Sequence, residues 1–303
     1  MRIVFVGAVD FSRHTLKAVL ENGGNVVGVI TLDEQYARRH ADFADLGPVA
    51  DRYGVPVYRI NKINNEIDLL RSLEPDVIFI FGWSQLISNE ILELPPLGCI
   101  GTHPALLPKN RGRHPLIWAL VEGLEESGLT FLYLDEGVDS GDILWQKPFP
   151  ITLDDDAGTL YEKIKVLAVE AITEFLPLLE AGTALRIVQD ADQATTWRKR
   201  SKDDGEIDWR TDTMETYNLV RALTHPYPGA HTYHDGAEVI IWKTALPESV
   251  LPDAAENLEP GELFTGDGDQ LCVCTGDGYL YLLAYEHPAG IELKAGMRLG
   301  KDR

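Results

Sequence analysis

The sequence contains few cysteines, and it lacks both metal-site motifs and long apolar segments. Only 3 of the 303 residues are cysteine, and no cluster has the spacing of a metal site. Cys272 and Cys274 lie two residues apart, which places them on one face of a strand and favours buried thiols over a disulfide. No apolar run reaches the roughly 18 residues of a membrane helix. We therefore expect neither a metal nor a membrane partner.

Basic residues are also few. Lysine and arginine number 27 against 48 aspartates and glutamates, which gives a net charge of -21. Such a surface repels nucleic acid unless a local basic patch overrides it, so a nucleic-acid partner is not expected. The first residues begin a strand at once, without a signal peptide, and this favours a cytoplasmic protein.

The pattern that is present is typical of an α/β fold. Residues 3–6 form an apolar run, a helix capped by Asp10 or Ser12 is expected to about residue 20, and residues 26–31 form a second apolar run. A strand, a helix and a strand in this order predict the start of a doubly wound parallel sheet. The residues after Gly7 do not form a GxGxxG pattern, so a dinucleotide site is poorly supported.

Two loops follow predicted strands of this sheet. Residues 33–45 are polar and irregular, and they form either a solvated loop or a substrate loop at the ligand edge. Residues 82–87 follow the apolar run 77–81, and Gly82 lets the backbone come close to a ligand. Free backbone N–H and C=O groups there could read a flat heterocycle. The alternative is an ordinary turn with a core tryptophan.

The strongest signal lies in residues 98–146. A predicted strand ends at His103, a helix over residues 116–124 returns the chain, and a strand over residues 129–134 ends before several carboxylates. We expect the imidazole and at least one carboxylate to meet at one edge of the sheet, where open α/β sheets bind ligands. A histidine with an aspartate commonly handles protons during attack on a carbonyl.

The last third of the chain changes character. After a long helix (residues 159–179), a polar segment (195–205) is expected to cross between two domains. A helix over residues 214–223 and several short strands then predict a small, mostly antiparallel, barrel-like domain from about residue 206. The predicted strands are residues 230–233, 239–243, 270–275 and 279–285.

Three central motifs resemble the formyltransferase family that uses 10-formyltetrahydrofolate. They are the string HPALLP at 103–108, the pair Arg111-Gly112 and the string DEGVDSGDI at 135–143. The spacing of 36 residues from His103 to Asp139 matches the catalytic histidine and aspartate of that family. The short motifs at residues 208–209, 218–222, 226–230 and 275–278 are similar to the C-terminal domain of methionyl-tRNA formyltransferases, which also occurs in a formyltransferase of nucleotide-linked aminoarabinose. The likeness covers nearly the whole chain.

The resemblance implies an α/β protein with a Rossmann-like catalytic domain (residues 1–200) and an OB-like β-barrel domain (206–303). It implies formyl transfer from 10-formyltetrahydrofolate, as co-substrate, to a primary amine, with no metal. His103 and Asp139 are then the catalytic pair, and which of them is the formal base stays open. Pro108 resembles a proline that follows a cis peptide bond in that family.

The same resemblance assigns binding residues. Those expected to contact the folate, the first three largely through the main chain, are Gln85, Leu86, Ile87, Asp135, Glu136, Gly137 and Asp142. Those expected to contact the acceptor are Asp10, Phe11, Ser12, Lys109, Asn110 and Arg111. Asp135 and Asp142 are equally suited to form turns. Arg111 and Arg113 are either ordinary surface residues or partners for a phosphate or carboxylate.

The chain departs from the family at one position. An asparagine usually stands two residues before the histidine, where this chain has Gly101. The missing amide would help to hold an oxyanion, and losing one such donor costs about 3 kcal/mol of transition-state stabilisation. Thr102, Asn110 or a backbone N–H could substitute. Otherwise the protein is slow, or it is a non-catalytic folate-binding relative.

Several acceptors fit the motifs: the amino group of a nucleotide-linked amino sugar, methionyl-tRNA, or an amino-acid-derived amine. Residues 201–303 contain 8 lysines and arginines against 19 aspartates and glutamates, a net charge of -11. A domain that binds tRNA should instead have a basic surface. We therefore rank the amino sugar first. The OB-like domain would then serve packing or the contacts of a homodimer.

Overall fold

The computed structural model describes residues 1–37, 42–247 and 257–301, which form two compact units. The first unit comprises Met1–Pro115, Glu126–Pro150 and Tyr161–Arg198. The second comprises Leu116–Glu125, Ile151–Leu160 and Lys199–Arg303. None of the helices in these described parts is both long and apolar enough to cross a membrane.

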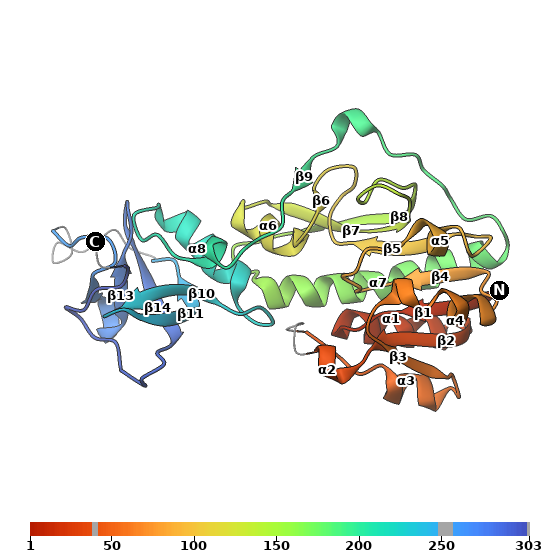
Figure 1. Ribbon diagram of the computed structural model, residues 1–303. Helices are drawn as coiled ribbons and strands as arrows, with labels where there is room; N and C mark the ends of the chain where they lie inside the picture. The colour runs from red at the N-terminus through yellow and green to blue at the C-terminus, as the bar shows by residue number, and fades with distance from the viewer. Residues whose placement is uncertain (38–41, 248–256, 302–303) are drawn as a thin grey trace. The chain divides into compact units, whose positions relative to one another are not determined.

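A seven-stranded sheet forms the centre of the first unit, in the order β3-β2-β1-β4-β5-β7-β8 (Figure 1). The strands are β1 (Arg2–Val6), β2 (Asn25–Leu32), β3 (Val57–Ile60), β4 (Val77–Ile80), β5 (Cys99–His103), β7 (Glu126–Tyr133) and β8 (Ile143–Pro150). The first five strands are parallel, whereas β7 is antiparallel to both β5 and β8. The predicted parallel α/β sheet is thus confirmed, with an antiparallel edge that was not predicted.

Helices cover both faces of this sheet. They are α1 (Asp10–Glu21), α2 (Glu34–Ala37), α3 (Gly47–Arg52), α4 (Ile67–Ser72), α5 (Asn89–Leu92) and α7 (Ala157–Glu180), of which residues 157–160 belong to the second unit. On one face the Phe175 ring of α7 lies 6.1 Å from the Phe79 ring and 5.0 Å from the Phe131 ring, measured between centroids. Aromatic pairs at these separations contribute stability beyond their buried area.

The other face of the sheet is covered by α4 and α5. Val4, Val6 and Ile78 of the sheet are fully buried against Leu70 of α4 and Ile91 of α5. Side chains along a strand point alternately to opposite faces, so a strand that is covered on both sides must be apolar throughout. This explains the uninterrupted apolar runs in the sequence.

The order of the strands reverses next to β1. The chain passes from β1 outward to β2 and β3, and then returns to place β4 on the other side of β1. Ligands bind at such a switch point, outside the carboxyl ends of the strands. The loops that begin at Gly7 and Phe81 leave the sheet at this point, and β5 ends at the same edge with His103.

The predicted route to the carboxylates was wrong. We expected a helix to return the chain so that the next strand would end at the same edge as His103. Instead Ile100 pairs with Tyr133 and His103 pairs with Thr130, so β7 ends at the opposite edge. The reason is that residues Leu116–Glu125, which include most of α6 (Pro115–Val121), fold with the second unit instead of crossing the sheet. A loop after β7 carries the carboxylates back.

The second unit contains a curled antiparallel sheet in the order β10-β11-β14-β13-β12. Its strands are β10 (Ala230–His234), β11 (Ala237–Ala245), β12 (Leu263–Thr265), β13 (Leu271–Cys274) and β14 (Tyr279–Glu286), and α8 (Thr213–Leu223) precedes them. The antiparallel second domain is confirmed, although the short β12 was not predicted. Cys272 and Cys274 are both buried on β13, as expected.

Candidate active site

The buried imidazole of His103, with 3% of the residue exposed, forms the centre of the site. Its Nε2 lies 2.7 Å from the carbonyl oxygen of Asn110. A carbonyl can only accept, so Nε2 carries a proton. Nδ1 lies 3.5 Å from Oδ2 of Asp139. The structure therefore brings together the histidine and the aspartate that the sequence singled out.

Asp139 is held in an unusual backbone conformation. Its φ is +52°, in the left-handed region that aspartate and asparagine adopt more readily than other non-glycine residues. Its Oδ2 accepts a hydrogen bond of 2.9 Å from the Gly112 N–H. Its Oδ1 accepts no hydrogen bond within the described ranges. One carboxylate oxygen is therefore fixed toward His103, and the other is open to a ligand.

Side chains of β7 and β8 hold the loop after His103 through hydrogen bonds. Oγ1 of Thr130 donates to the carbonyl of Ala105 at 2.7 Å, and Nε2 of Gln146 donates to that of Leu107 at 2.9 Å. The peptide bond before Pro108 is cis, as the resemblance predicted.

Residues 186–197, which we call the strap, hold the other side of this loop. Ile187 exchanges two backbone hydrogen bonds of 2.8 and 2.9 Å with Ile143. The Thr195 hydroxyl accepts from the Asn110 N–H at 2.8 Å and donates to Oδ1 of Asn110 at 3.1 Å. The sequence predicted only that residues 195–205 cross between two domains. In the structure, Thr195 belongs to the site.

The strap also explains why position 112 is glycine. Its β9 (Thr196–Trp197) lies parallel to β6 (Arg111–Gly112). Gly112 has a φ of +103°, and a Cβ there would lie 2.2 Å from the carbonyl oxygen of Trp197. Glycine alone allows the Gly112 N–H to reach Asp139.

Gln189 of the strap is a site residue that sequence analysis missed. It is buried, and its Nε2 donates to the carbonyls of Asp139 at 2.9 Å and Gly141 at 2.7 Å. Nothing in the sequence distinguishes it from the other polar residues of that segment. Only the folded strap shows what Gln189 contacts.

Three cationic side chains follow His103 closely in the chain: Lys109, Arg111 and Arg113. None of them forms an ion pair with a carboxylate in the described parts of the chain. Lys109 and Arg113 are exposed, and the Arg111 guanidinium donates to the neutral Oε1 of Gln189. Their positive charges are therefore available to a ligand.

The loop after β4 offers backbone groups for a heterocycle. Among the residues that the structure describes, the N–H groups of 83–87 donate to no acceptor. The Gln85 side chain is used inside the fold, because Nε2 donates to the carbonyl of Asn61 at 2.7 Å and Oε1 accepts from the Ile63 N–H at 3.1 Å. Leu86 is 75% exposed. Such a loop fits a pterin that is read through the main chain.

The loop of residues 135–142 contains one carboxylate that shapes it and one that is free. Oδ1 of Asp135 accepts from the Gly137 N–H at 3.1 Å and from the Ser140 hydroxyl at 2.8 Å, which is a turn-forming role. Glu136 accepts from Asn89 of α5 at 3.2 Å. The carboxylate of Asp142 accepts no hydrogen bond from the described residues, so it can contact a ligand.

Leu134 occupies the space beside Gly101. A Cβ on Gly101 would lie 2.6 Å from Cδ2 of Leu134. A side chain at position 101 therefore requires Leu134 to move. Of the suggested substitutes for the missing amide, Asn110 has its Oδ1 bound to Thr195, while its Nδ2 donates to none of the described residues.

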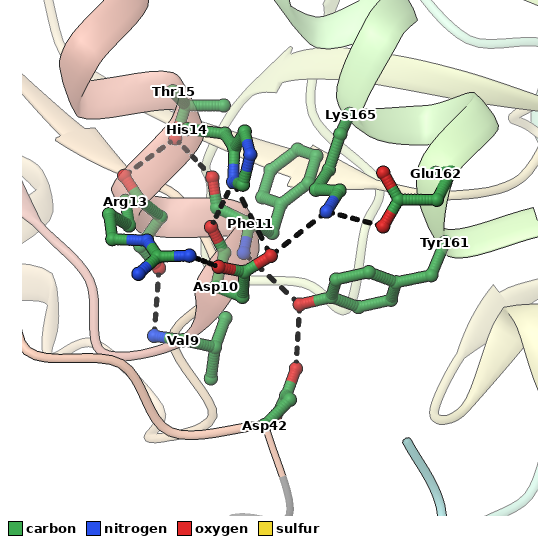
Figure 2. Close-up of polar contacts among 11 residues, drawn as sticks. Val9, Asp10, Phe11, Arg13, His14, Thr15, Asp42, Tyr161, Glu162 and Lys165 are labelled. Carbon is green, nitrogen blue, oxygen red and sulfur yellow. Dashed lines mark hydrogen bonds and ion pairs between the residues drawn. The ribbon is translucent and has the colours of Figure 1, made fainter. Parts of the chain in front are cut away.

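The start of α1 carries a dense group of charges (Figure 2). Oδ2 of Asp10 accepts from Nζ of Lys165 at 2.9 Å and lies 3.4 Å from Nδ1 of His14, while Oδ1 pairs with Arg13. Lys165, with 9% of its side chain exposed, also pairs with Glu162 at 2.5 Å. We call these five residues the Asp10 cluster.

Ion pairing outweighs burial in the Asp10 cluster. Burial raises the pKa of Asp10, but the hydrogen bond from Lys165 and the nearby positive charges lower it more, so the pKa is lowered overall. Burial lowers the pKa of Lys165, but hydrogen bonds to Glu162 and Asp10 raise it overall. Both groups stay charged at neutral pH, and they neutralise each other.

The two residues after Asp10 are buried. The Phe11 N–H donates to the Tyr161 hydroxyl at 3.1 Å. The Ser12 hydroxyl donates to the carbonyl of Phe81 at 2.6 Å and accepts from the N–H groups of Ala8 and Val9. The expected cap of α1 was wrong: Val9 is the N-cap residue, because Ser12 is drawn inward between the ends of β1 and β4.

The loop that follows β2 is described only in part. The structure describes α2 and residues 42–45 of the predicted loop 33–45, and residues 38–41 lie outside the described residues. The Tyr161 hydroxyl donates to Oδ2 of Asp42 at 2.7 Å, so the far end of that loop is tied to α7 (Figure 2). No three histidine, cysteine or carboxylate side chains in the described ranges could hold a metal ion.

Comparisons with known proteins agree with this site. The family described as "Formyl transferase" matches residues 1–176, and "Formyl transferase, C-terminal domain" matches residues 199–297. The methionyl-tRNA formyltransferase of Geobacter sulfurreducens is 32% identical over 99% of this chain and 97% of its own length.

Two solved structures share the fold. HypX from Aquifex aeolicus in complex with tetrahydrofolic acid has a TM-score of 0.68 at 21% identity, over 95% of this chain and 44% of that chain. The N-formyltransferase from Helicobacter canadensis in complex with folinic acid and dTDP-3-aminofucose has a TM-score of 0.69 at 17% identity, over 94% of this chain and 99% of that chain. The resemblance of the motifs is confirmed: this chain belongs to the formyl transferase family and is an enzyme that transfers a formyl group from formyl-tetrahydrofolate.

Proposed function

We propose that the acceptor of this formyltransferase is a small anionic molecule, an amino sugar carried by a nucleotide. The formyl group is transferred to the primary amine of the sugar. His103 and Asp139 are the catalytic pair in this proposal. Lys109 and Arg111 contact the acceptor, and the loops of residues 83–87 and 135–142 contact the folate.

The observation that carries this proposal is the set of three cations that closely follow His103 in the chain. The chain as a whole has a net charge of -21, yet Lys109, Arg111 and Arg113 have no carboxylate partner among the described residues. Unneutralised cations at the edge of a site favour a ligand with phosphate groups, which arginine can bind bidentately. The phosphates of a nucleotide-linked sugar meet this requirement.

The proposed catalytic roles follow from the protons that must move during formyl transfer. Bound formyl-tetrahydrofolate supplies a formyl group on nitrogen. The acceptor amine must lose a proton when it becomes an amide, and Oδ1 of Asp139 is open to receive the amine N–H. Nδ1 of His103, 3.5 Å from Oδ2, can take this proton and give it to the folate nitrogen, which needs a proton when its bond to the formyl carbon breaks. The carbonyl of Asn110 fixes the ring through Nε2.

An acceptor screen tests the proposal. Purified protein is incubated with 10-formyltetrahydrofolate and, separately, with dTDP- and UDP-linked amino sugars, free amino acids and charged initiator tRNA. We expect a formylated sugar, detected by mass spectrometry, and unchanged tRNA. Formylation of the tRNA with no reaction on any sugar would overturn the proposal.

Methionyl-tRNA is the second candidate acceptor. The relative from Geobacter sulfurreducens that carries this activity in its name is 32% identical over nearly the whole chain. Against it stands the net charge of -11 over residues 201–303, because a surface that binds tRNA gains much of its affinity from neutralised phosphates.

A further inference from the structure

Gln189 joins two parts of the proposed site through one side chain. Its amide nitrogen donates to the carbonyls of Asp139 and Gly141, at 2.9 and 2.7 Å. Its amide oxygen accepts from Nε and Nη2 of Arg111, at 3.2 and 2.7 Å. An amide has two donor hydrogens and two acceptor lone pairs, so every hydrogen-bonding group of Gln189 is used.

The chemistry of these partners requires an amide at position 189. Two carbonyl oxygens need a donor, and a guanidinium needs an acceptor. A carboxylate could accept from Arg111, but it could not donate to the carbonyls and would place like partial charges against them. A cationic side chain could donate to the carbonyls but would repel Arg111. The same partners also fix which end of the amide is nitrogen.

Because Gln189 is neutral, it orients charged groups without neutralising them. The Arg111 guanidinium is held in place but keeps its full charge. Gln189 holds the backbone of Asp139, which has a φ of +52°, through the Asp139 carbonyl. The Asp139 carboxylate is therefore not used by Gln189, and it accepts from the Gly112 N–H and faces His103. Residues in this region of φ stay there only when their surroundings hold them.

We propose that Gln189 is a positioning residue for formyl transfer: it fixes the acceptor-binding Arg111 relative to the catalytic Asp139. The proposal rests on the catalytic pair proposed above. The strap holds Gln189 in place from both sides. Ile187 and Thr195 form hydrogen bonds with the chain segments that carry Asp139 and Arg111.

Gln189→Glu and Gln189→Met test this role. The glutamate has the same shape but cannot donate and neutralises Arg111, whereas methionine removes all four bonds and keeps the length. A shift of about 1 Å in a reacting group can lower a rate about 100-fold, so we expect kcat to fall about 10- to 100-fold in both variants. The KM for the acceptor should rise in the glutamate variant, because Arg111 loses its net charge there.

Gln193→Met is the matched control. Gln193 lies in the same strap, but its amide donates to the Asp190 carboxylate, outside the site. We expect kcat and KM within twofold of the wild type. Hydrogen exchange gives a readout that needs no acceptor: the amides of residues 139–143 should exchange faster in Gln189→Met and not in Gln193→Met.

A double variant separates positioning from general destabilisation. If Gln189 acts through Asp139, adding Gln189→Met to Asp139→Ala should lower kcat by less than a further twofold. The inference would be overturned if Gln189→Met lowered kcat as strongly in the Asp139→Ala background as it does in the wild type. It would also be overturned if kcat stayed within twofold of the wild type in both Gln189 variants. Wild-type kcat in Asp139→Ala would instead refute the catalytic pair, so the two failures are distinguishable.

Discussion

Two groups of charged side chains lie at the same edge of the sheet in the first unit, and their charges are used differently. In the Asp10 cluster, Asp10 is surrounded by Arg13, His14 and Lys165, and Lys165 is shared with Glu162. Every charge there has a partner within the protein. Such a group offers little net charge to a ligand, and removing one of its partners destabilises the fold because it leaves another charge unpaired.

Around His103 the charges are left without partners. Arg111 is oriented by a neutral amide, Lys109 has no carboxylate partner in the described residues, and Asp139 keeps one oxygen open. The comparison shows that this acidic chain leaves Lys109 and Arg111 without a neutralising carboxylate among the described residues, as the proposed acceptor site requires. Groups near catalysis are expected to be held in position and yet remain unneutralised.

The largest expected effect is on turnover. His103→Ala and Asp139→Ala should each lower kcat about 100- to 10,000-fold, because a positioned acid or base typically contributes that much. Lys165→Met should change kcat less than tenfold. Steady-state rates with the acceptor identified by the screen measure both. Equal losses at His103 and Lys165 would contradict the division into a catalytic and a structural group.

The second effect is on acceptor affinity. Arg111→Met should raise the KM for a phosphate-bearing acceptor about 10- to 100-fold, since a hydrogen bond to a charged group is worth about 1.5 to 3 kcal/mol. Added salt should weaken acceptor binding by the wild type more than by the variant. Arg71→Met is the matched control, because Arg71 is exposed and paired with Glu90. An unchanged KM in Arg111→Met would contradict the proposed contact.

The third effect is on stability. Lys165→Met removes the shared cation from Asp10 and Glu162 and should lower the free energy of unfolding by about 1 to 3 kcal/mol, between the values for exposed and buried pairs. The midpoint of urea denaturation, followed by circular dichroism, measures the loss. Lys17→Met, which removes an exposed pair with Glu21, should change the midpoint little. An equal effect of both variants would show that the Asp10 cluster is not a special source of stability.

The pH dependence of stability should follow from the same cluster. The pKa of Asp10 is lowered in the fold from 3.8, so its contribution is present above that pH and is lost as the pH falls through the folded pKa. The pKa of Lys165 is raised from 10.5, so its contribution is present below that pH and is lost as the pH rises further. Urea midpoints measured across pH should show both losses in the wild type and smaller ones in Lys165→Met.

A fourth effect concerns Gly101, two residues before the proposed catalytic histidine. Gly101→Asn should destabilise the protein by about 1 to 3 kcal/mol, as overpacking does, because Leu134 occupies the space. Adding Leu134→Ala should recover part of that loss. Leu134→Ala alone is the control for the cavity that it creates. A single Gly101→Asn variant with wild-type stability would show that Leu134 moves aside freely.

Much of this arrangement could be predicted from the sequence, because it depends on local patterns. The apolar runs predicted the parallel strands and the meeting of His103 with a carboxylate, and the resemblance to the formyltransferase family indicated that this carboxylate is Asp139. The antiparallel course of β7 could not be predicted, since it depends on residues 116–125 folding with the second unit. Gln189 could not be predicted either, because its role exists only once the strap lies across two distant loops.

The smallest expected effect tests whether the proposed catalytic pair stands on a rigid sheet. Cys99 begins β5, the strand that ends at His103, and burial raises the pKa of its thiol to about 12. Burial raises the pKa of Cys272 and of Cys274 to about 11. All three should stay uncharged and unreactive toward thiol reagents at neutral pH until the protein is unfolded.

The sign of the pH effect follows from these raised values. The thiols of the unfolded chain ionise near pH 9, whereas the folded ones stay protonated up to about pH 11 or 12. Their contribution to stability is therefore complete below pH 9 and is lost as the pH rises toward those values. Rapid labelling of Cys99 in native protein at neutral pH would show that β5 opens readily. The proposed catalytic histidine would then stand on a mobile strand, and the unneutralised charges near it would not be held in position as the comparison requires.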